Sequence, residues 1–168
     1  HDLAVVAQVA DHIVVLYNGE IKEAGPVETI INKSEHPYTK RLMGAIKPLP
    51  KAGLGEASNH AHMRDVPALE AKSVDAGYGR DSEGKPKTMV LRDVNVAIER
   101  GKTVGIIGES GCGKSTLARV FAGLLPPSDG HLKLDGESIA LDLRNRSREE
   151  LRKVQFVYQM ADTALNPR

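Results

Sequence analysis

The chain has 168 residues, of which 40% are apolar and 27% are charged, a composition typical of a soluble globular protein. A formal net charge of +1, without a long run of Lys or Arg, argues against a nucleic-acid partner. A single cysteine, Cys112, excludes an internal disulfide, and no apolar stretch is long enough to span a bilayer, which favours the cytoplasm as the compartment.

The first quarter of the chain predicts a helix, a hairpin and two further helices. Apolar residues at near-helical spacing predict a helix over residues 2–10, and the apolar run at 12–17 predicts a strand. Asn18-Gly19 favours the tight turn of a hairpin whose second strand covers residues 20–24. Gly25-Pro26 then ends that strand and begins a helix with Pro at its first position. A further helix is expected over residues 37–46.

A linker follows at residues 48–66. The stretch from Pro48 to Pro67 contains three prolines and two glycines and has almost no apolar periodicity. The pair His60 and His62 has the spacing of a metal site, but without acidic or thiol partners we interpret it as solvated linker.

The remainder of the chain alternates strands and helices. Strands are predicted over residues 68–78, 90–99, 103–107, 131–134 and 154–158, the last one as a buried strand. Helices are predicted over residues 114–125 and 147–153, the second opened by a Ser cap. The first two strands are expected to form an antiparallel pair around the turn at 79–87.

The turn between the strand at 103–107 and the helix after it reads GESGCGKST and satisfies the pattern of a phosphate-binding P-loop. Its glycines allow successive N–H groups to turn inward around phosphate oxygens, and the helix N-terminus adds free donors and a positive dipole end. Lys114 is expected to neutralise the β- and γ-phosphates, and the Ser115 hydroxyl to bind Mg²⁺. The candidate nucleotide-binding residues here are Gly108, Glu109, Ser110, Gly111, Cys112, Gly113, Lys114, Ser115 and Thr116. Cys112 has two interpretations, a thiol of lowered pKa or a small side chain that fills the loop, and the second is favoured.

Three stretches together resemble ATP-binding-cassette (ABC) ATPases: the loop itself, the strand VQFVYQ, and HDLAVVAQVADHIVVLYNGEIKEAGPVETI. The resemblance implies that ATP and Mg²⁺ are the ligands. It also implies that His1 is the switch residue that senses the γ-phosphate and that Gln159 reaches Mg²⁺ and the attacking water. Tyr78, upstream of the loop, is the candidate aromatic that stacks on adenine.

The order of these parts implies two domains. In one ABC domain the P-loop precedes the switch His, whereas here the His segment comes first. We therefore expect residues 1–47 to be the tail of a first ABC domain and residues 67–168 to be the first half of a second. The fold class implied is α/β, an incomplete P-loop NTPase core sheet with an antiparallel β subdomain. No LSGGQ-like signature and no apolar strand ending in Asp-Glu occurs in the sequence, so we expect the chain to be a fragment that is inactive alone.

The segment HPYTKRLMGAI and the string LNPR resemble importer ATPases of the oligopeptide, dipeptide and nickel group, although QMADTALNPR departs from that group's usual QDPxxSLNPR. The resemblance implies a peripheral subunit on the cytoplasmic face of the inner membrane. Its partners would be transmembrane permease subunits, the other ABC domain in a head-to-tail sandwich, and a solute-binding protein. Alternatives are a soluble tandem ABC protein that acts on ribosomes or DNA, and an unrelated P-loop kinase of small molecules.

One expectation concerns how the two segments meet. The strand at 103–107 lacks the neighbours that its own domain would supply downstream, and a bare buried-type strand leaves backbone groups unpaired. In the ABC family the strand after the switch His lies parallel to the P-loop strand. Residues 13–17 are therefore expected to pair in parallel with residues 103–107, as in a circularly permuted domain.

Overall fold

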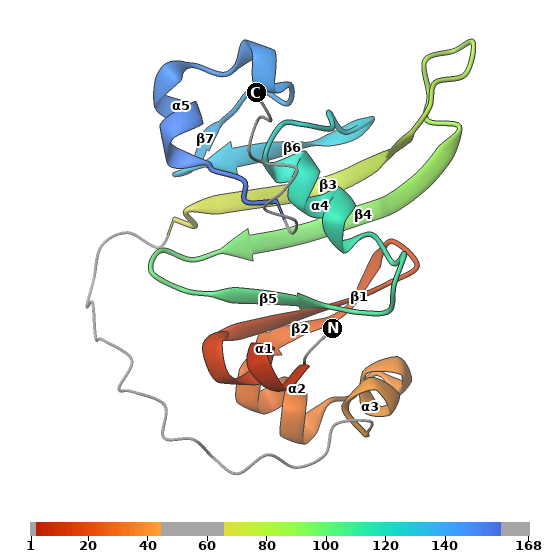
Figure 1. Ribbon diagram of the computed structural model, residues 1–168, viewed down its shortest axis with the longest axis vertical. Helices are drawn as coiled ribbons and strands as arrows, with labels where there is room; N and C mark the ends of the chain where they lie inside the picture. Colours follow the sequence, from red (N-terminus) through yellow and green to blue (C-terminus); the bar gives the residue numbers. More distant parts are fainter. Residues whose placement is uncertain (1–2, 45–65, 159–168) are drawn as a thin grey trace, which may run out of the picture.

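The computed structural model describes residues 3–44 and 66–158, which form a mixed α/β fold with two sheets (Figure 1). In the first sheet the strand order is β2 (Glu20–Pro26), β1 (His12–Tyr17) and β5 (Val104–Ile107). In the second it is β4 (Thr88–Ile98), β3 (Leu69–Tyr78), β6 (Asp129–Leu134) and β7 (Glu137–Ser138). Helices α2 and α3 pack on the first sheet, and α4 packs on the second. The predicted α/β class with an antiparallel sheet beside the P-loop sheet is confirmed.

Residues 3–44, the first segment, form a hairpin flanked by helices. Its elements are α1 (Leu3–Val9), β1 (His12–Tyr17), β2 (Glu20–Pro26), α2 (Val27–Lys33) and α3 (Pro37–Gly44). Asn18 and Gly19 join the two strands with φ angles of 49° and 81°, the left-handed conformation that this turn requires. Pro26 is the last residue of β2 and the N-cap of α2. The sequence predicted it one position further along, as the first residue of the helix.

The second segment contains both the antiparallel sheet and the P-loop strand. Its elements are β3 (Leu69–Tyr78), β4 (Thr88–Ile98), β5 (Val104–Ile107), α4 (Lys114–Phe121), β6 (Asp129–Leu134), β7 (Glu137–Ser138), a short 3₁₀ turn (Leu143–Asn145) and α5 (Arg148–Lys153). The expected antiparallel pairing of β3 with β4 is confirmed. Ser147 caps α5, accepting a hydrogen bond from Glu150 N–H while the Glu150 side chain accepts one from Ser147 N–H.

The two segments are joined by a parallel ladder between β1 and β5. His12, Ile13, Val14 and Val15 lie opposite Val104, Gly105, Ile106 and Ile107 in order. Figure 1 shows this pair side by side, with β1 in red near the start of the chain and β5 in green far along it. The expected parallel pairing is therefore confirmed, and β1 supplies β5 with a backbone partner.

Strand β1 contributes to two hydrophobic clusters because alternate residues of a strand face opposite sides. Val14 and Leu16 pack with β3, β4, β6 and α4, whereas Ile13 and Val15 pack with residues of α2 and α3 and with Ile107. Val15 and Leu16 are fully buried. The first segment is therefore part of the core beneath the P-loop.

Two predicted elements differ in the structure. Helix α4 ends at Phe121 instead of residue 125 because Gly123 adopts a φ of 73°; Gly123 N–H then bonds to Val120 and Leu124 N–H to Arg119, which closes the helix end. The predicted buried strand at residues 154–158 is wrong, since this stretch has no ladder partner within the part of the chain that the structure describes. Val157 is 91% exposed, and a strand without a neighbour leaves its backbone groups to water.

Candidate functional site

The Gly-rich loop connects β5 to α4 and rests on the β1-β2 hairpin. The N–H of Gly19 in the hairpin turn donates to the carbonyl of Cys112 at 3.0 Å. A Cβ on Gly108 would overlap the carbonyl oxygen of Leu16 in β1 and would lie 2.7 Å from Cys112 Sγ. The path of the loop therefore depends on close backbone contact with the first segment.

Lys114 points back into the loop from the first turn of α4. Its Nζ donates to the carbonyl oxygens of Gly108 at 2.9 Å and Glu109 at 2.7 Å, and it lies 3.6 Å from Cys112 Sγ. The ammonium group is thus held where incoming phosphate oxygens can replace neutral carbonyls as its partners, which gives a stronger charge-assisted bond. Cys112 is buried in the core below, as the interpretation of a small space-filling side chain predicts.

The loop offers the other features that a phosphate cradle needs. The N–H groups in the first turn of α4 have no acceptor within the helix, so they are available to an anion. A Cβ built on Gly111 meets no atom within 4 Å, so space is open there, and Ser115 next to Lys114 is exposed. Thr116, in the first turn of α4, is buried.

Tyr78 lies beside the first turns of α4. Its hydroxyl is 3.3 Å from Thr116 Oγ1 and accepts a hydrogen bond from Arg119 Nη1 at 3.0 Å. The residue stays 38% exposed, so part of its ring is free to contact a ligand. The structure thus brings the candidate adenine-stacking residue next to the helix that begins in the loop.

Tyr38 is a site residue that the sequence did not indicate. It belongs to α3, it is only 5% exposed, and its hydroxyl accepts a hydrogen bond from the N–H of Glu109 at 3.1 Å. No sequence signal marks this contact, because the two residues are separated by 71 positions and meet only through the β1-β5 ladder.

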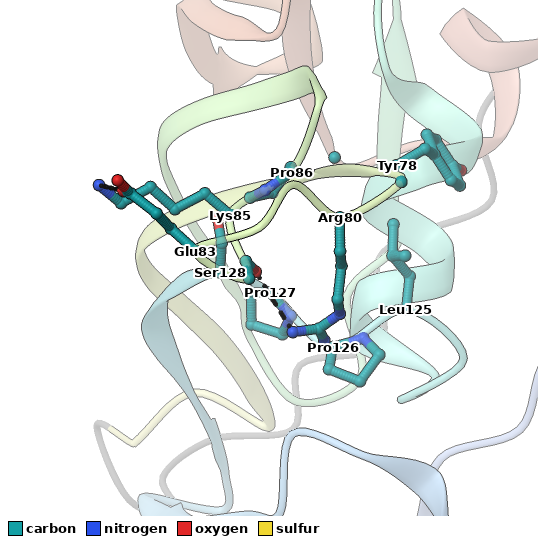
Figure 2. A pocket seen from close by; sticks show the side chains of 12 residues that line it. Tyr78, Arg80, Glu83, Lys85, Pro86, Leu125, Pro126, Pro127 and Ser128 are labelled. Carbon is teal, nitrogen blue, oxygen red and sulfur yellow. Dashed lines mark hydrogen bonds and ion pairs between the residues drawn. The ribbon is translucent and has the colours of Figure 1, made fainter.

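A pocket of about 470 Å³ lies on another side of Tyr78. It is formed by the loop between β3 and β4 and by Pro126, Pro127 and Ser128 after α4. Figure 2 shows the Arg80 side chain reaching into this pocket, where Nη1 donates to the carbonyl of Gly84 at 3.3 Å, while the Tyr78 ring points away from it. No residue of Gly108–Thr116 lines the pocket, so it is distinct from the phosphate cradle.

Several predicted site residues lie outside the described residues. These are His1 and Gln159; the linker pair His60 and His62 and the string LNPR also lie outside them. Within residues 3–44 and 66–158 no group of three or more His, Cys, Asp or Glu side chains is arranged to hold a metal ion. In the same ranges, no helix has both the length and the apolar character needed to cross a membrane.

A sequence profile of the family described as ABC transporter matches residues 91–168. The whole chain aligns with the glutathione import ATP-binding protein GsiA of Escherichia coli K12, with 27% identity over 194 aligned residues. The chain spans 31% of the length of that relative.

Two solved structures show further similarity. The structure of cbiO1 from Clostridium perfringens, part of the ABC transporter complex cbiONQ, is 32% identical to this chain. The match covers 53% of this chain and 31% of the cbiO1 chain, with a TM-score of 0.41. A bacterial Atm1-family ABC exporter with ATP bound is 27% identical. The match covers 68% of this chain and 18% of the exporter chain, with a TM-score of 0.42.

Proposed function

We propose that the chain carries part of an ABC transporter ATP-binding domain, and that Gly108–Thr116 binds ATP in a protein that couples ATP hydrolysis to solute import. The solute class proposed is a peptide or a related small molecule. The observation that carries this proposal is the strand, loop and helix unit in which Lys114 Nζ donates to the loop carbonyls of Gly108 and Glu109.

Different residues of the site bind the phosphates, the adenine base and the metal ion. Lys114 and the N–H groups of the loop bind the phosphates, and Tyr78 stacks on adenine, a contact worth about 1 to 3 kcal/mol. Ser115, which is exposed, and Gln159 would hold Mg²⁺ through their side-chain oxygens, and the ion would neutralise developing charge on the phosphates. Hard oxygen donors of this kind suit Mg²⁺.

The domain arrangement proposed is a tandem one. Residues 1–47 are the tail of a first ABC domain whose ATP site includes His1, residues 48–66 are the linker, and residues 67–168 begin a second ABC domain. The alignment of the whole chain with one stretch of a longer import ATP-binding protein supports this order. It also favours an importer over the alternative of a tandem ABC protein that acts on ribosomes or DNA.

The partners follow from this arrangement. The intact protein is proposed to bind permease subunits at the cytoplasmic face of the membrane, with each ATP sandwiched between its two ABC domains. A solute-binding protein would deliver the cargo to the permease. These partners rest on the importer assignment and on the similarity to a glutathione import ATP-binding protein.

The test of ATP binding is calorimetric titration of ATP with Mg²⁺ into the chain and into Lys114→Ala. Removal of the ammonium leaves the phosphate charge unpaired, so we expect affinity to fall at least tenfold. Circular dichroism of both proteins controls for folding. An affinity of Lys114→Ala within twofold of the original chain would contradict the proposed role of the loop.

We also expect the 168-residue chain to release no phosphate from ATP above the level of Lys114→Ala. The reason is that its sequence contains no LSGGQ-like signature and no strand that ends in Asp-Glu. A steady malachite-green signal that depends on Lys114 would show that the missing motifs are not needed.

A further inference from the structure

Tyr38 in α3 holds the first peptide of the phosphate loop from the side opposite to Lys114. The peptide between residues 108 and 109 has one N–H and one carbonyl. Its N–H donates to the Tyr38 hydroxyl at 3.1 Å, and its carbonyl accepts from Lys114 Nζ at 2.9 Å. Both polar ends of a single peptide plane are thereby fixed.

The Tyr38 side chain is itself held firmly. The centres of the Tyr38 and Tyr17 rings are 4.3 Å apart, with an angle of 38° between the ring planes. The Arg41 guanidinium carbon lies 5.5 Å from the centre of the Tyr38 ring. Burial raises the pKa of the Tyr38 hydroxyl, which therefore stays neutral and able to accept a hydrogen bond throughout the neutral range. The hydroxyl is a fixed acceptor rather than a mobile surface group.

We infer that Tyr38 is a positioning residue for nucleotide binding, which acts across the two segments of the chain by fixing the peptide between Gly108 and Glu109. This inference rests on the proposed binding of ATP at the loop. Without the hydroxyl, the Glu109 N–H loses its acceptor and the peptide is free to rotate. Rotation of this peptide would take the loop out of the shape that surrounds phosphate.

The mechanism predicted is preorganisation. A loop that is already held in its binding shape loses less conformational freedom when the ligand arrives, so its affinity is higher. Because a single hydrogen bond makes a modest net contribution, we expect loss of the Tyr38 hydroxyl to weaken ATP binding about threefold to tenfold.

The experiment compares Tyr38→Phe with Tyr17→Phe in the complete chain, with Lys114→Ala as reference. Tyr38→Phe keeps the ring but removes the acceptor of Glu109 N–H, while Tyr17→Phe removes the hydroxyl of the stacked neighbour. ATP affinity is measured by calorimetry, and the Glu109 amide is followed by NMR through its chemical shift and hydrogen-exchange rate. We expect weaker binding, a shifted resonance and faster exchange only in Tyr38→Phe.

The outcomes separate this inference from the proposed function. If Tyr38→Phe binds ATP within twofold of the original chain while Lys114→Ala does not, Tyr38 has no positioning role and ATP binding at the loop stands. A chain that binds no ATP overturns both ideas. If Tyr38→Phe does not fold, the hydrogen-exchange rate of the Glu109 amide in the unmodified chain tests the inference instead. Rapid exchange of that amide would contradict its hydrogen bond to Tyr38.

Discussion

Asp11 ties the two segments together at the start of the β1-β5 ladder. Its Oδ2 accepts a hydrogen bond from Thr103 N–H at 2.8 Å, and its own N–H donates to the Thr103 carbonyl at 2.9 Å. The Thr103 N–H, helped by Lys102 at 3.7 Å, holds the pKa of the Asp11 carboxyl below its usual value. The charged form of Asp11 is therefore favoured by folding.

A pH prediction follows from this shift. Because the folded-state pKa lies below the unfolded one, the stabilisation by Asp11 is complete above about pH 5 and is lost as pH falls through the unfolded and then the folded value. We expect urea midpoints of the chain to fall more steeply between pH 5 and pH 3 than those of Asp11→Asn. Parallel curves for the two proteins would show that the Asp11 charge does not support the docking of the segments.

At the scale of elements, helix α1 packs closely on β5 because residue 105 has no side chain. A Cβ on Gly105 would overlap Val6 Cγ1 and would lie 3.3 Å from the Cβ of Ala10. Gly105 lies opposite Ile13 in the parallel ladder, so a displacement of α1 from Gly105 would disturb the β1-β5 pairing that joins the two segments.

We predict that Gly105→Ala lowers the free energy of unfolding by about 1 to 3 kcal/mol, the usual cost of overpacking. The second substitution Val6→Ala removes the overlapping methyl group and should recover part of this loss. Gly44→Ala is the matched control, since a Cβ there meets no atom within 4 Å. Chemical denaturation checks the original chain, Gly105→Ala, Val6→Ala, the double variant and Gly44→Ala, and an additive double variant would rule out the contact between α1 and residue 105 as the cause.

At the scale of the whole molecule, residues 3–44 and residues 66–158 share their cores. Val14 and Leu16 of β1 lie in the cluster formed with β3, β4 and α4, while Ile107 of β5 lies in the cluster formed with the first segment. The covalent connection is therefore not the principal contact between them.

This arrangement predicts that the chain stays together after its linker is cut. A protease site placed at residues 51–56 should yield two pieces that elute together in gel filtration at micromolar concentration, because the ladder and both clusters remain intact. In the same background, Val15→Asp should separate the pieces, whereas Val9→Asp at a 62% exposed position should not. Separation of the unsubstituted pieces would mean that the linker, rather than the ladder, maintains the contact.

The sequence by itself determined the features that depend on near neighbours along the chain. Asn18-Gly19 specifies its turn through its own φ angles, the string GESGCGKST specifies a strand, loop and helix unit, and Ser147 caps α5 through a residue three positions away. The pairing of β1 with β5 was predicted too, but from the ABC resemblance and the unpaired edge of β5, since no local pattern selects a distant partner.

Tertiary structure alone decided the features that depend on a distant partner. The apolar run at residues 154–158 has the composition of a strand, yet a strand exists only where a neighbour accepts its hydrogen bonds. Tyr38 reached Glu109 only because the β1-β5 ladder places α3 beside the loop. Composition and periodicity describe what a segment favours, whereas backbone pairing and burial depend on which other segment occupies the space beside it.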